Sequence, residues 1–150
     1  VVGKMTAIGD VEGRNVLIVD FGTAVTIDLV TADNTFRGGC ISPGVTMRFR
    51  ALHDYTAKLP LCAATGGEGL SGLTTEEAIE LGVMNGIAFE IEGYVTRMRE
   101  KIDGLRVIFT GGDAKFFVKR IKNTIFANCN LVFCGLDRIL EYNASEEHLD

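Results

Sequence analysis

The chain contains 150 residues, of which 47% are hydrophobic and 23% charged, and its formal net charge is -5. These values are typical of one globular domain with a substantial core. No basic run interleaved with aromatic residues indicates a nucleic-acid-binding surface, and no apolar segment is long enough to span a bilayer. With no visible signal peptide, the sequence predicts a cytoplasmic protein with neither nucleic acid nor membrane as a partner.

The cysteines argue against a metal or disulfide framework. Four of them are widely spread along the chain, at Cys40, Cys62, Cys129 and Cys134. They form no Cys-x-x-Cys pair, and only two histidines could add imidazole ligands. A zinc site does not fit these spacings, so we expect reduced and mostly buried thiols.

The first part of the chain predicts the end of a helix and then an antiparallel meander. Residues 1–9 are typical of a helix, and the chain has no initiator methionine. We therefore expect a fragment or a trimmed chain that starts inside this helix. Short β-branched runs predict strands at residues 15–20, 24–30 and 35–41. Short polar turns join these strands, as in a meander.

A helix and a loop follow the meander. Ser42 is a suitable N-cap and Pro43 is a favoured first helical residue, so the pattern predicts a helix from there to just before Leu59. Residues 62–73 are rich in glycine and lack periodicity. They predict a loop, and loops of this length are often functional.

The next predicted element is a long helix, which Thr74 or Thr75 caps and which runs to about residue 102. Apolar residues recur in it at helical spacing. Each glycine within it weakens the helix by roughly 1 kcal/mol relative to alanine. The three internal glycines, which are either tolerated or mark close packing against a neighbouring helix, are Gly82, Gly86 and Gly93.

The last part of the chain alternates strands and helices. A strand at 105–109 leads into the turn 110–113, Thr-Gly-Gly-Asp, and then into a helix at 114–120. Open α/β sheets bind ligands at such a turn, outside the carboxyl end of a strand. A strand at 130–133 and a helix at 136–142 follow. The order βββ, helices, β, α, β, α predicts an α/β fold, βββα(α)βαβα, with a mixed five-stranded sheet and helices on both faces.

The segment Asp20-Phe21-Gly22-Thr23 carries the most informative chemistry. It joins the first two predicted strands in a tight turn. A phosphate can approach Gly22 closely because glycine has no Cβ, and the amide and hydroxyl of Thr23 can donate to phosphate oxygens. The carboxylate of Asp20 can hold a cation against the same phosphates. A plain hairpin with polar turn residues explains the spacing equally well.

The complete set of motifs resembles the C-terminal half of the type III pantothenate kinase family. Five patterns occur in the family's order and span nearly the whole chain. They are Asp-x-Gly-Thr-Ala-x-Thr-x-Asp at 20–28, Gly-Gly-x-Ile-x-Pro-Gly at 38–44, Thr-Ala-x-Leu-Pro at 56–60, Gly-x-x-Thr-x-x-Ala at 72–78 and Thr-Gly-Gly at 110–112. The resemblance implies one half of an actin-like, ribonuclease-H-like ATPase fold, with residues 1–150 as a single domain.

The resemblance implies a function and site residues as well. The family transfers a phosphoryl group from ATP, carried as its Mg²⁺ complex, to the hydroxyl of pantothenate in the first step of coenzyme A synthesis. By position, Asp20 is expected to coordinate potassium or ammonium, Thr23 to contact ATP phosphates, and Thr75 to contact pantothenate. From the residues alone, a helix cap without a ligand remains the alternative for Thr75. The resemblance also implies a homodimer, with the substrate pocket at the subunit interface.

Two family motifs do not occur in the chain. They are the first phosphate motif, Asp-x-Gly-Asn-Thr, and Gly-x-Asp-Arg, which supplies the catalytic base. The base is therefore expected upstream of Val1, because Asp113 and Asp137 are wrongly placed to replace it. We expect the isolated chain to be inactive. The alternatives are a non-catalytic binding or regulatory module of the same fold, and another actin-like kinase acting on a different small molecule.

Overall fold

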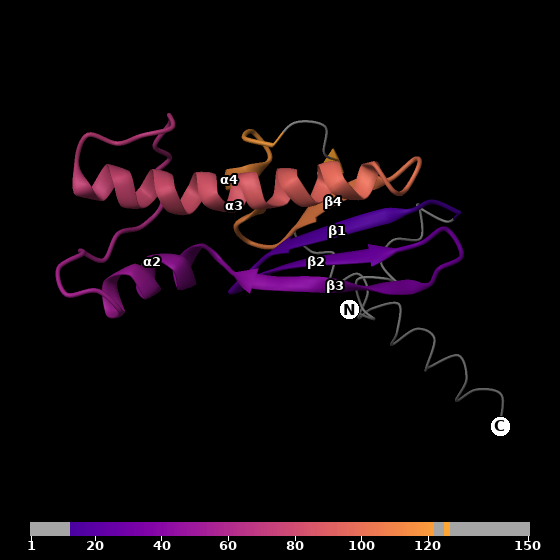
Figure 1. Ribbon diagram of the computed structural model, residues 1–150, viewed down its shortest axis with the longest axis horizontal. Coiled ribbons are helices and arrows are strands. Elements are labelled where there is room, and N and C mark those ends of the chain that lie inside the picture. The colour runs from indigo at the N-terminus through magenta and orange to yellow at the C-terminus, as the bar shows by residue number, and fades with distance from the viewer. Residues whose placement is uncertain (1–12, 122–124, 127–150) are drawn as a thin grey trace, which may run out of the picture.

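The computed structural model describes residues 13–121 and 125–126, which form a mixed sheet with helices packed against it (Figure 1). The elements are β1 (Val16–Phe21), β2 (Ala24–Val30), β3 (Phe36–Pro43), α2 (Val45–Asp54), α3 (Thr75–Arg99), β4 (Arg106–Thr110), α4 (Ala114–Phe117) and β5 (Ile125–Phe126).

The strand order in the sheet is β3-β2-β1-β4-β5. β1 and β2 pair antiparallel, as do β2 and β3, which confirms the predicted meander. β4 returns to pair parallel with β1, in the register Val16 with Arg106 and Asp20 with Thr110. A parallel pair needs a long crossover connection, which α2, the loop after it and α3 provide. The α/β class with a mixed sheet is therefore confirmed.

β1 lies in the middle of this sheet and is buried on both of its faces. Leu17, Val19 and Phe21 point to the face that α3 covers, where they belong to the main hydrophobic cluster. Val16 and Ile18 point to the opposite face and are also buried. A strand buried on both faces has no reason to alternate with polar residues, which explains its continuous apolar run.

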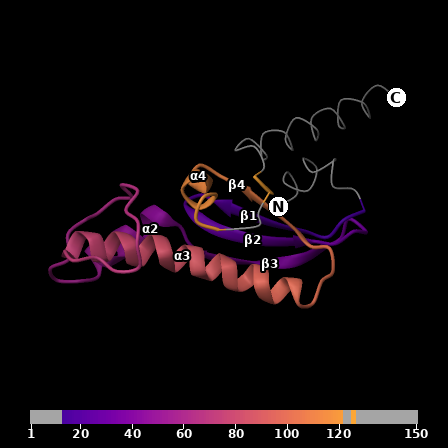
Figure 2. The same cartoon turned by 90° about the horizontal axis from the view of Figure 1, so that it is seen from above.

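The long helix α3 runs along one face of the sheet (Figure 2). Its buried positions recur at intervals of four residues along one stripe, at Ile79, Val83, Ile87, Ile91 and Val95. A capping box fixes its start, because the Glu77 amide donates to Thr74 Oγ1 and the Thr74 amide donates to the Glu77 carboxylate, both at 3.2 Å. Thr74 is therefore the N-cap and Thr75 is the first helical residue.

Some predicted boundaries were wrong. Pro43 does not open a helix but ends β3, where it pairs with Ala24. Sheet pairing holds Pro43 in an extended conformation, and Gly44 becomes the N-cap of α2. The helix after Asp113 was predicted to reach residue 120, yet α4 ends at Phe117.

Other predictions lie outside the described residues. These are the helix at 1–9, the strand at 130–133 and the helix at 136–142. In the described part, β4 pairs on its other side with the two-residue strand β5, which was not predicted. The helices α2, α3 and α4 contribute to one hydrophobic cluster, and helices on the second face stay a prediction.

Candidate functional site

Two glycine-containing turns meet at one edge of the sheet. β1 and β4 are parallel neighbours, so their carboxyl ends lie side by side, and Gly22-Thr23 follows the first while Gly111-Gly112 follows the second. A hydrogen bond of 3.1 Å from the Asp113 amide to the Phe21 carbonyl joins the two turns. This is the position at which α/β sheets bind ligands, as the sequence predicted.

Asp20 lies at the centre of this edge. Its carboxylate faces the backbone of Gly111, where an added Cβ atom would lie 2.4 Å from Asp20 Oδ1 and 2.5 Å from the Phe21 carbonyl oxygen. Gly111 has φ of +95°, a conformation that favours glycine. The carboxylate of Asp20 is thus held between the two turns that would receive a phosphate.

The amino end of α2 packs against the first turn. The Gly44 amide donates to the Thr23 carbonyl at 3.1 Å. A Cβ atom on Gly44 would lie 2.3 Å from the Gly22 carbonyl oxygen, so only glycine allows this approach. The start of α2 therefore lies directly beside Gly22 and Thr23, and the helix extends away from them (Figure 1).

A cavity of about 510 Å³ opens beside these turns. Its lining combines both turns with one face of α2: Phe21, Gly22, Thr23, Thr46, Met47, Arg50, Gly112 and Asp113. A second cavity of about 500 Å³ adjoins it and shares Thr46, Arg50 and Asp113. Residues 61–64, where the glycine-rich loop begins, form its other wall. Together the two cavities make a cleft of the size that small-molecule ligands occupy.

Asp113 also lines this cleft, although the sequence suggested only that it is wrongly placed to replace the catalytic base. Burial raises the pKa of its carboxyl group, and nearby Lys115 opposes that rise in part. Its side chain makes no capping hydrogen bond to α4, although it occupies the N-cap position. The clue in the sequence was its place directly after the strand and the glycine pair.

Thr75 lies in a different cavity, of about 690 Å³, between α2 and α3. The α2 residues that line this cavity are Arg48, Ala51 and Leu52, none of which lines the cleft beside Thr23. The structure thus brings Asp20 and Thr23 together, but it places Thr75 on another side of α2. Since Thr74 is the cap, the exposed Thr75 side chain is not the N-cap of the helix.

A buried carboxylate holds the glycine-rich loop in place. Glu80 Oε1 accepts hydrogen bonds from the amides of Thr65, Gly66 and Gly67 at 2.6, 2.9 and 3.1 Å, and Oε2 accepts from the Thr65 hydroxyl at 2.7 Å. Asn85 donates to the Gly69 carbonyl at 2.8 Å. Sequence reasoning missed this network, although a glutamate between Ile79 and Leu81 on a buried helix face was a visible signal.

The described residues contain no cluster of three or more side chains suited to a metal ion. Asp20 is a carboxylate at a strand end, and a carboxylate oxygen suits a hard cation. Phosphates suit the glycine turns, where backbone amides can be approached closely. The donors present therefore fit a nucleotide with an accompanying cation. In the same part of the chain, no helix combines the length and hydrophobicity that crossing a membrane requires.

Two curated proteins similar to this chain carry the same name. A protein from Flavobacterium psychrophilum is 46% identical over 129 residues, covering 86% of this chain and 54% of the relative. One from Phocaeicola vulgatus is 47% identical over 131 residues, covering 87% of this chain and 54% of the relative. Both are named type III pantothenate kinase. The chain thus spans about half the length of the curated relatives it matches.

Solved structures show a shared fold. A Baf family transcriptional activator from Campylobacter jejuni matches with a TM-score of 0.67 at 24% identity, over 96% of this chain and 65% of the other. An activator of 2-hydroxyisocaproyl-CoA dehydratase from Clostridium difficile, solved with ADPNP, matches with a TM-score of 0.54 at 15% identity. The match covers 99% of this chain and 69% of the other. These likenesses show that the chain shares its fold with both proteins.

The family itself is shown by a sequence model. The model described as type III pantothenate kinase matches residues 1–97, which include both the Gly22-Thr23 turn and the start of α3. The relatives named above agree with it over most of the chain. The chain belongs to the type III pantothenate kinase family.

Proposed function

We propose that this chain is the C-terminal half of an ATP-dependent pantothenate kinase. The observation that carries the proposal is the cleft at the carboxyl ends of β1 and β4, where Asp20, Thr23 and two glycine turns converge in a chain of this family. In the reaction, the bond between the γ-phosphorus of ATP and its bridging oxygen breaks. A new bond forms from that phosphorus to the pantothenate hydroxyl oxygen, and a base accepts the hydroxyl proton.

In this proposal the chain's own residues position charge. The amide and hydroxyl of Thr23 donate to ATP phosphate oxygens, and the glycine turns let the phosphates approach the backbone. The Asp20 carboxylate holds a potassium or ammonium ion beside them, and Mg²⁺ accompanies the nucleotide. Positioning and charge neutralisation account for most catalysis of phosphoryl transfer.

The catalytic base and the other half of the nucleotide site belong, in this proposal, to the N-terminal half of the kinase. Residues 1–150 alone are therefore expected to be inactive. Pantothenate-dependent ADP formation by purified residues 1–150 would contradict this, and would favour a base within the chain. Asp113 would then be the first candidate, because burial raises its pKa and it lines the cleft.

The position of Thr75 supports a homodimer. Its cavity lies apart from the phosphate turns, so we propose that Thr75 contacts pantothenate at a subunit interface. The adjoining surface of α3 carries Gly82, Gly86, Phe89 and Gly93 at helical spacing on one stripe. A Cβ atom on Gly82 or Gly93 would meet no described atom within 4 Å, and Phe89 is 56% exposed. This surface can accept the same surface of a second copy.

The main test replaces Asp20 by alanine in the full-length kinase. We expect turnover of ATP with pantothenate to fall about 100-fold or more, because one preorganised electrostatic contact is commonly worth that much. ADP release is measured with and without potassium. Wild-type turnover that needs both pantothenate and potassium, and that Asp20→Ala abolishes, supports the proposal. Absence of pantothenate-dependent turnover under any cation would favour the binding-module alternative.

The dimer is tested with Phe89→Glu in the same protein. A charge on each copy of this exposed position would be buried against its counterpart, so we expect the dimer to dissociate at micromolar concentration. Light scattering gives the mass, and circular dichroism checks the fold. Leu70→Glu is the matched control, because it also adds a charge at an exposed apolar side chain (83% exposed) but lies outside α3. A Phe89→Glu protein that stays dimeric would exclude this stripe as the interface.

A further inference from the structure

One face of α2 forms a wall of the cleft. Thr46 and Arg50 are separated by one helical turn, and both line the cavity beside Gly22-Thr23 and the adjoining cavity. Side chains on a helix lean toward its amino end. This lean favours a path of the Arg50 side chain along α2 toward Thr46, with which it lines both cavities.

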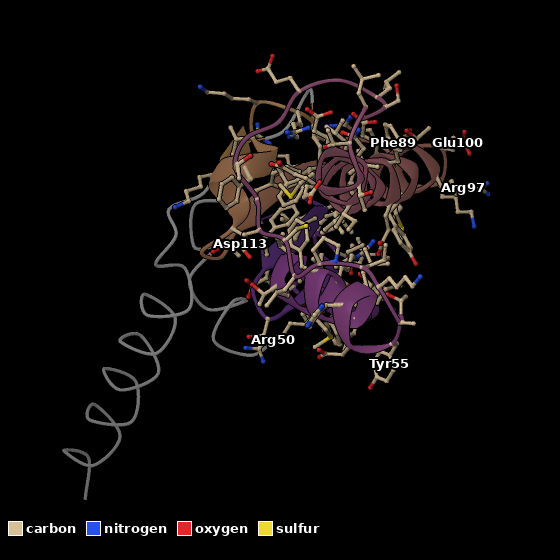
Figure 3. All side chains as sticks on the ribbon, turned by 90° about the vertical axis from the view of Figure 1, so that its left-hand side faces the viewer. Arg50, Tyr55, Phe89, Arg97, Glu100 and Asp113 are labelled. Carbon is tan, nitrogen blue, oxygen red and sulfur yellow. The ribbon has the colours of Figure 1, made fainter. Side chains whose placement is uncertain are left out.

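Arg50 is exposed and has no partner among the described residues. No hydrogen bond or ion pair joins it to another group, whereas Arg48, two residues earlier, pairs with Glu90 and donates to the Pro43 carbonyl. Figure 3 shows Arg50 on α2 and Asp113 beyond β4 on the same side of the molecule. Asp113 nevertheless forms no ion pair with Arg50.

The charge of the cleft gives this arginine a role. Its lining residues include the carboxylate of Asp113, and Asp20 lies just behind the glycine turns. Among the described residues, Arg50 is the one cationic side chain that lines either of the two cavities of this cleft. A polyphosphate entering the cleft adds further negative charge. A guanidinium binds phosphate oxygens with two parallel donors, which a lone lysine cannot do.

The position of Arg50 in the cleft indicates which phosphate of the nucleotide it contacts. Thr46, Arg50 and Asp113 are shared by both cavities, so they stand where the cavity of the glycine turns opens into the cavity of the loop. In the proposed function, phosphates held by Gly22 and Thr23 would lie beside that junction.

We propose that Arg50 binds the terminal phosphate of the nucleoside triphosphate and neutralises its charge during transfer. The role of Arg50 in phosphoryl transfer rests on the proposed function. Its role in nucleotide binding is argued only from the residues that line the cleft. The proposal assigns Arg50 to the γ-phosphate rather than to the acceptor. It also predicts that Arg50 distinguishes ATP from ADP.

The test compares Arg50→Gln and Arg50→Lys in the full-length kinase. We expect Arg50→Gln to weaken binding of a non-hydrolysable ATP analogue about 10- to 100-fold, the worth of one or two charge-assisted hydrogen bonds. ADP affinity should change less than about threefold, because ADP lacks the γ-phosphate. Arg50→Lys should restore part of the loss, since it keeps the charge without the planar pair of donors. Calorimetry measures both affinities.

Arg106→Gln is the matched control, because Arg106 is exposed at the amino end of β4, away from the cleft. Equal losses for ATP and ADP, or no loss beyond that of Arg106→Gln, would overturn the proposal. A higher KM for pantothenate with unchanged ATP affinity would do so too, by assigning Arg50 to the acceptor. Failure of the proposed function has a different signature, since wild-type protein would then lack pantothenate-dependent turnover while ATP binding still depended on Arg50.

Discussion

Replacing Gly111 by alanine will remove the activity of the full-length kinase and lower its stability by about 3 kcal/mol or more. The position has φ of +95°, which costs a residue with a Cβ atom free energy before any contact is considered. The added Cβ would also lie 2.4 Å from Asp20 Oδ1 and 2.5 Å from the Phe21 carbonyl oxygen. Both atoms lie at the carboxyl end of β1, where the phosphates are proposed to bind. Relief of the overlap must therefore displace the end of β1 or of β4.

The neighbouring glycine provides the control. A Cβ atom on Gly112 would have no described atom within 4 Å, and its backbone is not in the left-handed region. Gly112→Ala should therefore change the free energy of unfolding by less than about 0.5 kcal/mol. Thermal unfolding followed by circular dichroism separates the two variants; ADP release is compared between Gly111→Ala and wild type only, because Gly112 itself lines the cavity. Equal losses of stability in Gly111→Ala and Gly112→Ala would show that the overlap with Asp20 and Phe21 does not determine the cost.

The sequence predicted those parts of the fold that local patterns determine. The meander depends on short β-branched runs and polar turns, and the start of α3 depends on Thr74 and Glu77, three residues apart. The sequence also contained the signal that the turns at Gly22 and Gly111 lie at the same edge of the sheet, because each turn follows a buried strand. Local patterns misplaced Pro43, since its preference for a first helical turn was overridden by its pairing with Ala24 in the sheet.

The site residues that escaped prediction depend on tertiary packing. Which face of α2 meets the cleft cannot be read from the helix alone, so neither Arg50 nor the separation of Thr75 from Thr23 was foreseen. The same holds for residues 62–73, which have no periodicity. Their path is set by hydrogen bonds to Glu80 and Asn85 on a different element, and no pattern within the loop records those partners.

Replacing Glu80 by leucine is expected to release this loop. The amides of Thr65, Gly66 and Gly67 would lose their common acceptor beside a buried helix face, at a cost of about 1–3 kcal/mol for each amide that finds no other partner. Hydrogen exchange at these amides should accelerate about 100-fold or more, equivalent to about 3 kcal/mol of local stability. Because residues 61–64 form a wall of the cleft in which we propose that ATP binds, the KM of the full-length kinase for ATP should rise as well.

Glu80→Gln tests whether an acceptor or a charge holds the loop. Glutamine keeps one oxygen that can accept from the three amides, and its NH₂ group can donate to the Thr65 hydroxyl. We therefore expect Glu80→Gln to retain most of the exchange protection that Glu80→Leu loses. If the two variants lost protection equally, the hydrogen bonds to Glu80 would not be what positions the loop.

The pH dependence of the loop follows from the same carboxylate. Burial of Glu80 opposes its ionisation, but hydrogen bonds from the Thr65 hydroxyl and from the amides of Gly67, Thr65 and Gly66 outweigh it, so the pKa lies below the usual 4.5. A group with a lowered folded pKa contributes stability that is complete above its unfolded pKa and is lost as pH falls through its folded pKa. After correction for intrinsic exchange rates, protection at 65–67 should thus be constant near neutrality and decline below about pH 4.5. Glu80→Gln cannot titrate, so its protection should show no such decline, and a decline of equal size in both proteins would assign the acid sensitivity to another group.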